Sequence, residues 1–324
     1  MRRCFLLLLP ILLAPGSGRA ATVLDQVRQA GVLRCAGVAR PGLAFPAADR
    51  TWHGLEVELC RAVAVAVLGD EARIEFRGLY APSSFEAARR GEDQLAFLTM
   101  QEMADRHLTG EMLPATPVFY LPEQVLVPGD STAASVSDLA GKMVCFEPGT
   151  RADRDLDALV SVRGMRVFYG PFFEAEEMID AFNVGRCDAI VGEATALAAL
   201  RLNVDEARQP ARLLPDILSV QPVFAAVPAG ADMRWAQIVA WAMQTSLVGD
   251  RLSKRGDGAS PLPPPILAPE LGLDRGWQAR TVAEVGSYDD LYRRALGDLS
   301  PLGLARGPNA SPAEGGLLDA PYAR

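Results

Sequence analysis

Short apolar segments alternate with helix-like segments along most of the 324 residues of this chain. Apolar runs of strand length predict buried strands, and apolar residues spaced by three or four predict the amphipathic helices between them. The predicted strands are residues 32–39, 72–76, 95–99, 118–127, 143–146, 166–169, 189–191 and 217–227, and the predicted helices are residues 23–30, 55–68, 83–90, 135–139, 174–184 and 195–202, a long helix behind Asp232, and residues 282–296. This alternation favours α/β architecture with parallel sheets, and the length allows two domains.

The segment from Met143 to Leu156 contains the most informative of the strand-to-helix turns. A short apolar strand is broken by Pro148-Gly149, and Thr150 with Asp153 resembles a capping box at the start of a helix. Free backbone N–H groups at such a turn can bind an anion, for example a carboxylate. The simpler interpretation of the same segment is one more strand-to-helix turn of an α/β protein.

The N-terminus has the pattern of a secretory signal peptide, residues 1–20. Arg2 and Arg3 precede an apolar run from Cys4 to Ala14, and small residues stand at the cleavage positions in Gly18-Arg19-Ala20. The run is too short to span a bilayer, and no later segment is apolar enough to do so. We therefore expect an exported, soluble mature protein that begins at Ala21.

Several function classes find little support in the sequence. A net charge of −8 without a basic stripe argues against a nucleic-acid partner. The only histidines, His53 and His107, do not lie near a nucleophile motif, and no Walker, HExxH or dinucleotide-binding glycine pattern occurs. We predict neither an enzyme nor a cofactor.

Four cysteines remain after removal of the signal peptide: Cys35, Cys60, Cys145 and Cys187. An even number in an exported chain favours disulfides, for which four cysteines allow three pairings. A zinc site is the alternative, but there is no CxxC pair and neither histidine lies near a cysteine cluster. No metal site is expected.

Three polar groups follow predicted strands and together suit a small zwitterion. Arg106 could grip a carboxylate in bidentate fashion, the Gly149-Thr150 turn could supply N–H donors, and Glu193 could hold an ammonium group. Ligands of open α/β sheets gather at the carboxyl ends of the strands. Taken singly, an ordinary surface ion pair explains Arg106 or Glu193 equally well.

The chain resembles the periplasmic solute-binding proteins of polar amino-acid ABC transporters (bacterial solute-binding protein family 3), in particular their general L-amino-acid-binding branch. The matching segments are GVLRCAGV, WHGLEVELCRAVAVAVLGD, Gly91-Glu92, Arg106, GKMVCFEPGT, GRCDAIVGE followed by ALAALRL, LLPDILSVQPVFAAV, LGLDRGW and SPLGLARGPNASPAEGGL. They keep the family's order over nearly the whole mature chain, and the cysteine positions match as well. The run from Ser300 to Leu317 is peculiar to that branch.

This resemblance implies a type II periplasmic binding protein fold, in which two lobes joined by a hinge close on a ligand. Each lobe would be a mainly parallel sheet flanked by helices. Lobe 1 would comprise residues 21–120 and 222–324, with a C-terminal extension, and lobe 2 residues 121–221. We favour the pairs Cys35–Cys60 and Cys145–Cys187, because each bridge then stays within one lobe.

The resemblance also implies site residues. Arg106 would bind the α-carboxylate of the ligand, Gly149 and Thr150 would donate N–H groups to it, and Glu193 would accept the α-amino group. Five positions depart from the family pattern. Gln101 and Met103 replace two threonines, Arg151 replaces a third, and Leu43 replaces the phenylalanine that walls the side-chain pocket. Glu193 stands where the family usually has an aspartate, which adds one methylene group. Arg151 near the mouth would favour a ligand with an acidic side chain.

The main functional prediction is a monomeric periplasmic protein that delivers a small amino acid, or a related amine-carboxylate, to an ABC permease in the inner membrane. The alternative is a divergent sensory or partner-binding module with the same fold and a degenerate pocket. A third possibility is an enzyme on this scaffold, since some dehydratases resemble these binders. It would need an acid/base pair in the cleft, for which only Glu147 and Glu193 are near enough.

Overall fold

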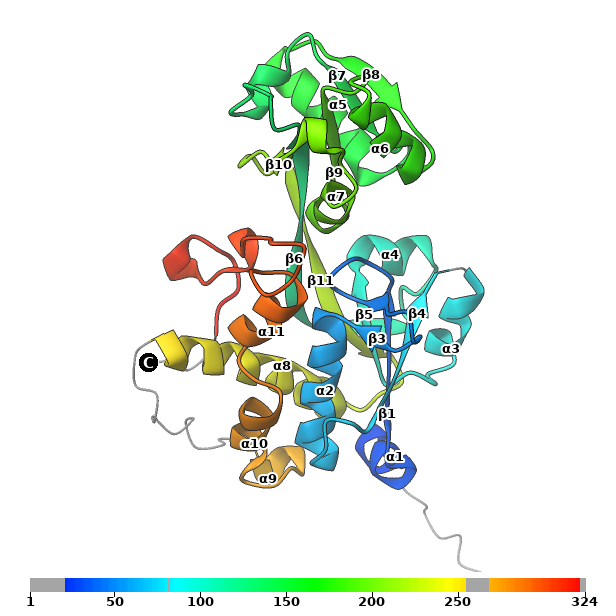
Figure 1. The fold of residues 1–324 in the computed structure, drawn as a ribbon. Coiled ribbons are helices and arrows are strands. Elements are labelled where there is room, and N and C mark those ends of the chain that lie inside the picture. The colour runs from blue at the N-terminus through cyan, green and yellow to red at the C-terminus, as the bar shows by residue number, and fades with distance from the viewer. Residues whose placement is uncertain (1–20, 81, 255–267, 321–324) are drawn as a thin grey trace, which may run out of the picture.

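The computed structural model describes residues 21–80, 82–254 and 268–320. The predicted signal peptide lies outside these residues, as does most of segment 261–269, which contains five prolines and which we interpret as a connector. The described elements form two groups, which are joined by the long strands β6 (Met112–Val127) and β11 (Ser219–Pro228) (Figure 1). We call the group that contains β1 lobe 1 and the group that contains β7 lobe 2.

The sheet of lobe 1 has the strand order β4-β1-β5-β11. Its strands are β1 (Leu33–Val38), β4 (Ile74–Leu79) and β5 (Leu95–Thr99), which are parallel, and the antiparallel β11. A small ribbon of β2 (Phe45–Pro46) and β3 (Trp52–His53) lies in the loop after β1. The helices of lobe 1 are α1 (Val23–Ala30), α2 (Leu55–Leu68), α3 (Glu86–Arg89), α4 (Met100–Asp105), α8 (Met233–Lys254), α9 (Ala268–Leu271), α10 (Trp277–Glu284) and α11 (Tyr288–Ala295).

Alternating residues of these strands supply two hydrophobic layers, as the two-residue period of a strand requires. Leu95 and Phe97 belong to the large cluster that includes α2 and α8, whereas Ala96 and Leu98 belong to the smaller cluster with α3 and α4. The apolar helix α2 is buried along almost its whole length, which explains why its sequence lacks a polar face.

Lobe 2 repeats this plan on a smaller scale. Its strands are β7 (Met143–Phe146), β8 (Phe168–Pro171) and β9 (Ala189–Glu193), which are parallel in the order β9-β7-β8, with β6 antiparallel beside β9 and β10 (Arg212–Leu213) beside β6. One face packs on α5 (Arg151–Arg163), and the other packs on α6 (Ala175–Asn183) and α7 (Ala194–Arg201). Val144 faces the first layer and Cys145 the second.

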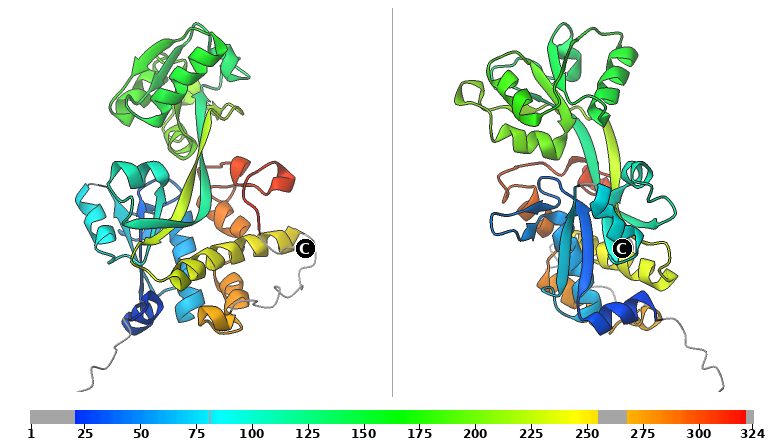
Figure 2. Two further views of the ribbon diagram at one scale, coloured as in Figure 1. Left: turned by 180° about the vertical axis from the view of Figure 1, so that it is seen from behind. Right: turned by 90° about the vertical axis from the view of Figure 1, so that its right-hand side faces the viewer.

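The two strands that join the lobes pair with each other over a long antiparallel ladder from Glu123–Ser219 to Met112–Pro228. Figure 2 shows them running without a break from one lobe into the other. The register shifts between Val223 and Phe224 and between Ala225 and Ala226, within lobe 1. Both lobes therefore belong to one continuous sheet, and β6 and β11 form the hinge.

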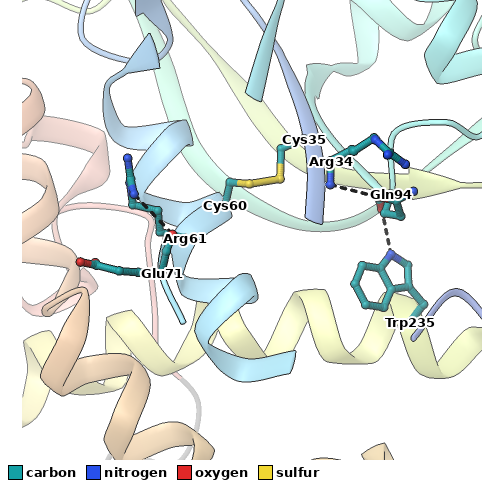
Figure 3. The surroundings of a disulfide bond; sticks show 7 residues. All are labelled: Arg34, Cys35, Cys60, Arg61, Glu71, Gln94 and Trp235. Carbon is teal, nitrogen blue, oxygen red and sulfur yellow. Dashed lines mark hydrogen bonds between the residues drawn. A yellow bond between two sulfur atoms is a disulfide. The ribbon is translucent and has the colours of Figure 1, made fainter. Parts of the chain in front are cut away.

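Both predicted disulfides are confirmed. Cys35–Cys60 ties β1 to α2 across 25 residues of sequence, and Cys145–Cys187 ties β7 to the turn before β9 across 42 residues. Figure 3 shows the first bridge beside Gln94, whose side-chain oxygen accepts a hydrogen bond from the Arg34 N–H and whose carbonyl accepts one from the indole of Trp235. The bridge and these bonds fasten β1, β5 and two helices together.

The single helix predicted over residues 282–296 is wrong, because the chain forms two helices there. Gly286 has a left-handed φ of 108° between α10 and α11, and Ser287 opens α11 through a capping box with Asp290. The irregular tail that follows is anchored. The side-chain amide of Asn309 bonds to both the N–H and the carbonyl of Tyr120 on β6, and Arg306 pairs with the buried Asp250.

Two other local expectations also needed correction. The helix expected over residues 83–90 is shorter, because a 3₁₀ turn over Pro82–Phe85 comes first and α3 covers only Glu86–Arg89. The strand expected over 72–76 is β4, which begins later because Asp70 holds residues 72 and 73 in a turn. Among the described residues, no helix combines the length and the apolar character needed to cross a membrane.

Candidate ligand-binding cleft

A cleft of about 780 Å³ lies between the lobes beside the hinge. Lobe 1 contributes the end of β1 and the loop after it, together with Arg106 after α4. Lobe 2 contributes the start of α5, the end of β9 and one side of α7. The polar residues that line the cleft are Arg40, Arg106, Glu123, Glu147, Thr150, Arg151, Glu193 and Asn203.

Arg106 is the C-cap residue of α4, the helix that follows β5, and it lines the cleft from lobe 1. Its guanidinium lies 5.3 Å from the centre of the Phe85 ring, a cation–π contact that orients it. It forms no ion pair with a described residue. The arginine predicted to bind a carboxylate is thus held by stacking, and its charge is available to a ligand.

Arg40 is the second arginine of the cleft, and sequence analysis did not identify it. Its guanidinium bonds to Glu102 at 2.5 Å within lobe 1 and to Glu193 at 3.3 Å in lobe 2. Burial alone would lower the pKa of Arg40, but the carboxylates of Glu102 and Glu193 beside it raise that pKa. The Arg40 guanidinium therefore forms ion pairs with a carboxylate of each lobe.

The environment of Arg40 in lobe 1 is built by two glutamates. Glu102 reaches back to cap Thr99 at the start of α4, which fixes its carboxylate next to Arg40. Glu56 is fully buried in the first turn of α2, and neither of its oxygens has a partner among the described residues. Burial raises the pKa of Glu56 well above its usual range, so we treat its carboxyl as neutral.

The turn at Gly149-Thr150 lies at the cleft, but its bonding differs from the prediction. Gly149 adopts the left-handed φ of 76°, and its N–H donates to the Asp153 carboxylate at 2.8 Å. The Thr150 hydroxyl donates to the Glu147 carbonyl at 2.6 Å and does not cap α5. The predicted capping box is wrong, because the Asp153 carboxylate accepts from the N–H of Gly149, one residue before Thr150. The Thr150 hydroxyl closes the turn.

Arg151 also lines the cleft, one residue into α5. Its Nε donates to the Ser219 hydroxyl at 2.8 Å, and it pairs with Asp155 at 3.4 Å. The hydroxyl of Ser219 in turn donates to Asp155. This network ties α5 to the hinge strand β11, so the charge of Arg151 is largely balanced within the protein.

Glu123 is the acid of the cleft that sequence analysis missed. It lies on β6 directly opposite Glu193 on β9, it is only 2% exposed, and its Oε2 has no partner among the described residues. Burial, with the nearby charges of Glu193 and Asp155, raises the pKa of Glu123 to about 8 against the opposing effect of Arg151 and Arg154. An acid inside the largely apolar run YLPEQVLV was the signal that could have revealed it.

Three other residues expected at the site lie outside the cleft lining. Leu43 is fully buried in the large core of lobe 1, and Met103 is 2% exposed in the smaller core under α4. Gln101 is exposed and bonds to Asp105 along the same helix. The structure therefore brings Arg106, Thr150, Arg151 and Glu193 together, places Gly149 just behind them, and leaves these three apart. In the described part of the chain, no group of three metal-binding side chains occurs.

Comparisons with known proteins agree with this architecture. No family model matches the chain. The general L-amino acid-binding periplasmic protein AapJ of Rhizobium johnstonii is 29% identical over 334 aligned positions, which cover 97% of this chain and 96% of AapJ. The glutamate/glutamine/aspartate/asparagine-binding protein BztA of Rhodobacter capsulatus is 27% identical over 328 positions, with 95% of each chain covered.

Solved structures lead to the same fold. A periplasmic binding protein of an ABC transporter from Brucella ovis, with glutathione bound, matches with a TM-score of 0.72 at 28% identity, over 94% of this chain and 100% of that one. An ancestral cationic amino-acid solute-binding protein matches in fold with a TM-score of 0.56 at 16% identity, over 85% of this chain and 100% of that one. The type II periplasmic binding protein fold is confirmed, and the chain is similar over nearly its whole length to solute-binding proteins of amino-acid ABC transporters.

Proposed function

We propose that this protein captures a small amino acid, or a related amine-carboxylate, between its two lobes and delivers it to an ABC permease. The protein would work in the periplasm as a monomer, after loss of residues 1–20. The proposed lobes are residues 21–120 with 222–324 and residues 121–221. The function is binding and delivery, without catalysis.

The observation that carries this proposal is the charge pattern of one cleft. Arg106 lines it from lobe 1 without an ion pair to a described residue, while Glu193 lines it from lobe 2. A carboxylate at Arg106 and an ammonium group at the acidic wall would each meet an opposite charge. The N-terminus of α5 at Thr150 adds a favourable dipole for the carboxylate.

The size of the cleft permits ligands larger than a simple amino acid. Its volume of about 780 Å³ falls in the usual range for small-molecule sites. The Brucella protein holds glutathione, itself a peptide with one ammonium and two carboxylate groups, and AapJ and BztA are named for amino acids. We therefore include glutathione with the amino acids as a candidate ligand. Gln101, Met103 and Leu43 have no direct contact with ligand in this proposal.

The alternative, a sensory module with a degenerate pocket, has less support. It would be favoured if Arg106 and Glu193, the two groups predicted to bind the ends of the ligand, were both already paired with protein charges. Glu193 is paired with Arg40, but Arg106 is stacked on Phe85 without a carboxylate partner among the described residues. Arg106, one of the two charged groups needed to bind a zwitterion, therefore has no protein carboxylate competing for it among the described residues.

A thermal-shift screen tests the proposal. Mature protein from Ala21 would be unfolded and refolded to remove carried-over ligand, and then heated with the common L-amino acids, glutathione, dicarboxylates and amines. A ligand at about 100 times its Kd adds about 2.7 kcal/mol to stability, which clearly raises the melting temperature. Cooperatively folded protein that shifts with none of these compounds would refute amino-acid capture and favour the sensory alternative.

A further inference from the structure

The acid that sequence analysis missed, Glu123, has properties that a purely structural side chain rarely has. It is 2% exposed, it lines the cleft, and its Oε2 is buried without a partner among the described residues. A buried carboxylate oxygen without a hydrogen bond is costly to the fold. Such an atom at the wall of a ligand cleft indicates a partner that is brought by the ligand.

The register of the sheet places Glu123 beside Glu193. The two residues lie directly opposite each other on antiparallel strands β6 and β9, so their side chains project from the same face. Glu193, however, already accepts a hydrogen bond from Arg40. Of the two neighbouring acids, the one whose charge has no direct ion-pair partner in the described chain is Glu123.

The remaining charges around Glu123 do not supply that partner. Asp155, Arg151 and Arg154 on α5 and Glu193 on β9 are the charged groups that influence it. Arg151 is engaged by Asp155 and Ser219, and Arg154 is an exposed residue whose guanidinium contacts the Gly149 carbonyl. The acidic wall therefore has room for one more cation.

We infer that Glu123 receives the ammonium group of the ligand, together with Glu193, and is a specificity-determining residue of the cleft. This inference rests on the proposed function and refines it, because it assigns the amine end of the ligand to the hinge strand β6. Since β6 belongs to both lobes, an ammonium bound there would lie at the hinge. Arg106 would hold the carboxylate farther out in lobe 1.

The assignment predicts that binding releases a proton. Glu123 in the free protein has a pKa of about 8, so it is mostly protonated at pH 7. An adjacent ammonium group favours the carboxylate and lowers that pKa, so the proton leaves when the ligand binds. Affinity should therefore rise with pH between pH 6 and pH 8, by up to tenfold per pH unit.

Isothermal titration calorimetry of the mature protein tests this inference. The probes are every L-amino acid and glutathione, with propionate and glutarate as the amine-free counterparts of L-alanine and L-glutamate. Titrations in HEPES and in Tris, which differ in ionisation enthalpy, count the protons released. The variants are Glu123→Gln, Glu123→Asp as the conservative replacement, and Glu206→Gln, an exposed acid of lobe 2, as the charge-matched control.

We expect Glu123→Gln to weaken binding of amine-bearing probes at least tenfold at pH 8, to flatten the pH profile and to abolish proton release. Glu123→Asp should retain proton release, Glu206→Gln should match the wild type, and any amine-free binder should be insensitive to Glu123→Gln. Unchanged affinity and pH profile in a folded Glu123→Gln protein would overturn the inference while leaving the proposed function intact. Affinity that falls as pH rises would also overturn it, because Glu123 would then donate a hydrogen bond as a neutral acid. Wild-type protein that binds no probe would overturn the proposed function and the inference together.

Discussion

The two sides of the cleft differ in charge. Lobe 1 contributes the arginines Arg40 and Arg106, whereas the acids Glu123, Glu147 and Glu193 come from the hinge and lobe 2, together with Arg151, which pairs with Asp155. A zwitterion that meets both walls would bind its carboxylate to one lobe and its ammonium group to the other. Capture of such a ligand is then coupled to the position of one lobe relative to the other, which is the physical requirement for a hinged binder.

The lobes also differ in how they are stabilised. Lobe 1 surrounds the buried α2 with a large core to which α8, α10 and α11 contribute. Lobe 2 has two smaller layers, one on each face of its sheet. Each lobe nevertheless has one disulfide. The smaller lobe, with less apolar surface to bury, should depend more on its bridge.

Removal of the disulfides tests this difference and should have the largest effect. Cys145→Ser with Cys187→Ser should cost about 4 kcal/mol, and Cys35→Ser with Cys60→Ser about 3.5 kcal/mol, because the Cys145–Cys187 bridge closes the longer loop. Urea unfolding of the two double variants measures both losses. If the lobe 1 variant lost clearly more stability than the lobe 2 variant, the comparison of the lobes would be wrong.

The buried acid of lobe 1 should give the protein a distinctive dependence on pH. Because burial raises the pKa of Glu56 in the folded protein, stability falls as pH rises through the unfolded pKa near 4.5 towards the folded value. Glu56→Gln removes this titration. Relative to the wild type, the variant should gain stability progressively as pH rises above about 4.5.

Chemical unfolding of wild type and Glu56→Gln at several pH values measures that gain. Glu58→Gln, two residues further along the same helix and partly exposed, is the control. A stability difference that stays constant with pH would show that Glu56 is ionised in the folded protein.

The ion pair between the lobes should contribute less. Arg40→Met breaks the contacts to Glu102 and Glu193 and should cost about 1–2 kcal/mol, because these carboxylates are only partly exposed. Arg34→Met on β1 removes an exposed pair with Glu75 and should cost under about 1 kcal/mol. Equal losses in the two variants would mean that Arg40 does not couple the lobes.

The fold was largely predictable, because strands and helices alternate with sharp glycine stops. The strands Leu95–Thr99 and Met143–Phe146 and the helix Val23–Ala30 match the predicted bounds. The failures lie where a polar side chain decides between two local structures. Ser287 with Asp290 starts a new helix inside an apparently continuous one, and Asp153 caps Gly149 in place of Thr150.

The cleft was predictable only in part, for a physical reason. Glu193 is at the end of a predicted strand and Arg106 lies in the segment after another, so their presence at the cleft could be deduced from the sequence. Arg40 and Glu123 acquire their roles from contacts across the cleft: Arg40 pairs with an acid in the other lobe, and Glu123 is paired in register with Glu193. Contacts between residues far apart in sequence leave no periodic signal in the chain.

The most direct test of amino-acid capture is calorimetric titration of wild type and Arg106→Ala with the amino acid or peptide that gives the largest thermal shift. The guanidinium of Arg106 lines the cleft, where it stacks on Phe85, and it forms no ion pair with a described residue. Arg106→Ala should therefore leave the fold intact. We predict a loss of affinity of at least about a hundredfold, or about 2.7 kcal/mol. A folded Arg106→Ala protein that binds the same ligand with unchanged Kd would contradict the account, because the carboxylate would then be held elsewhere.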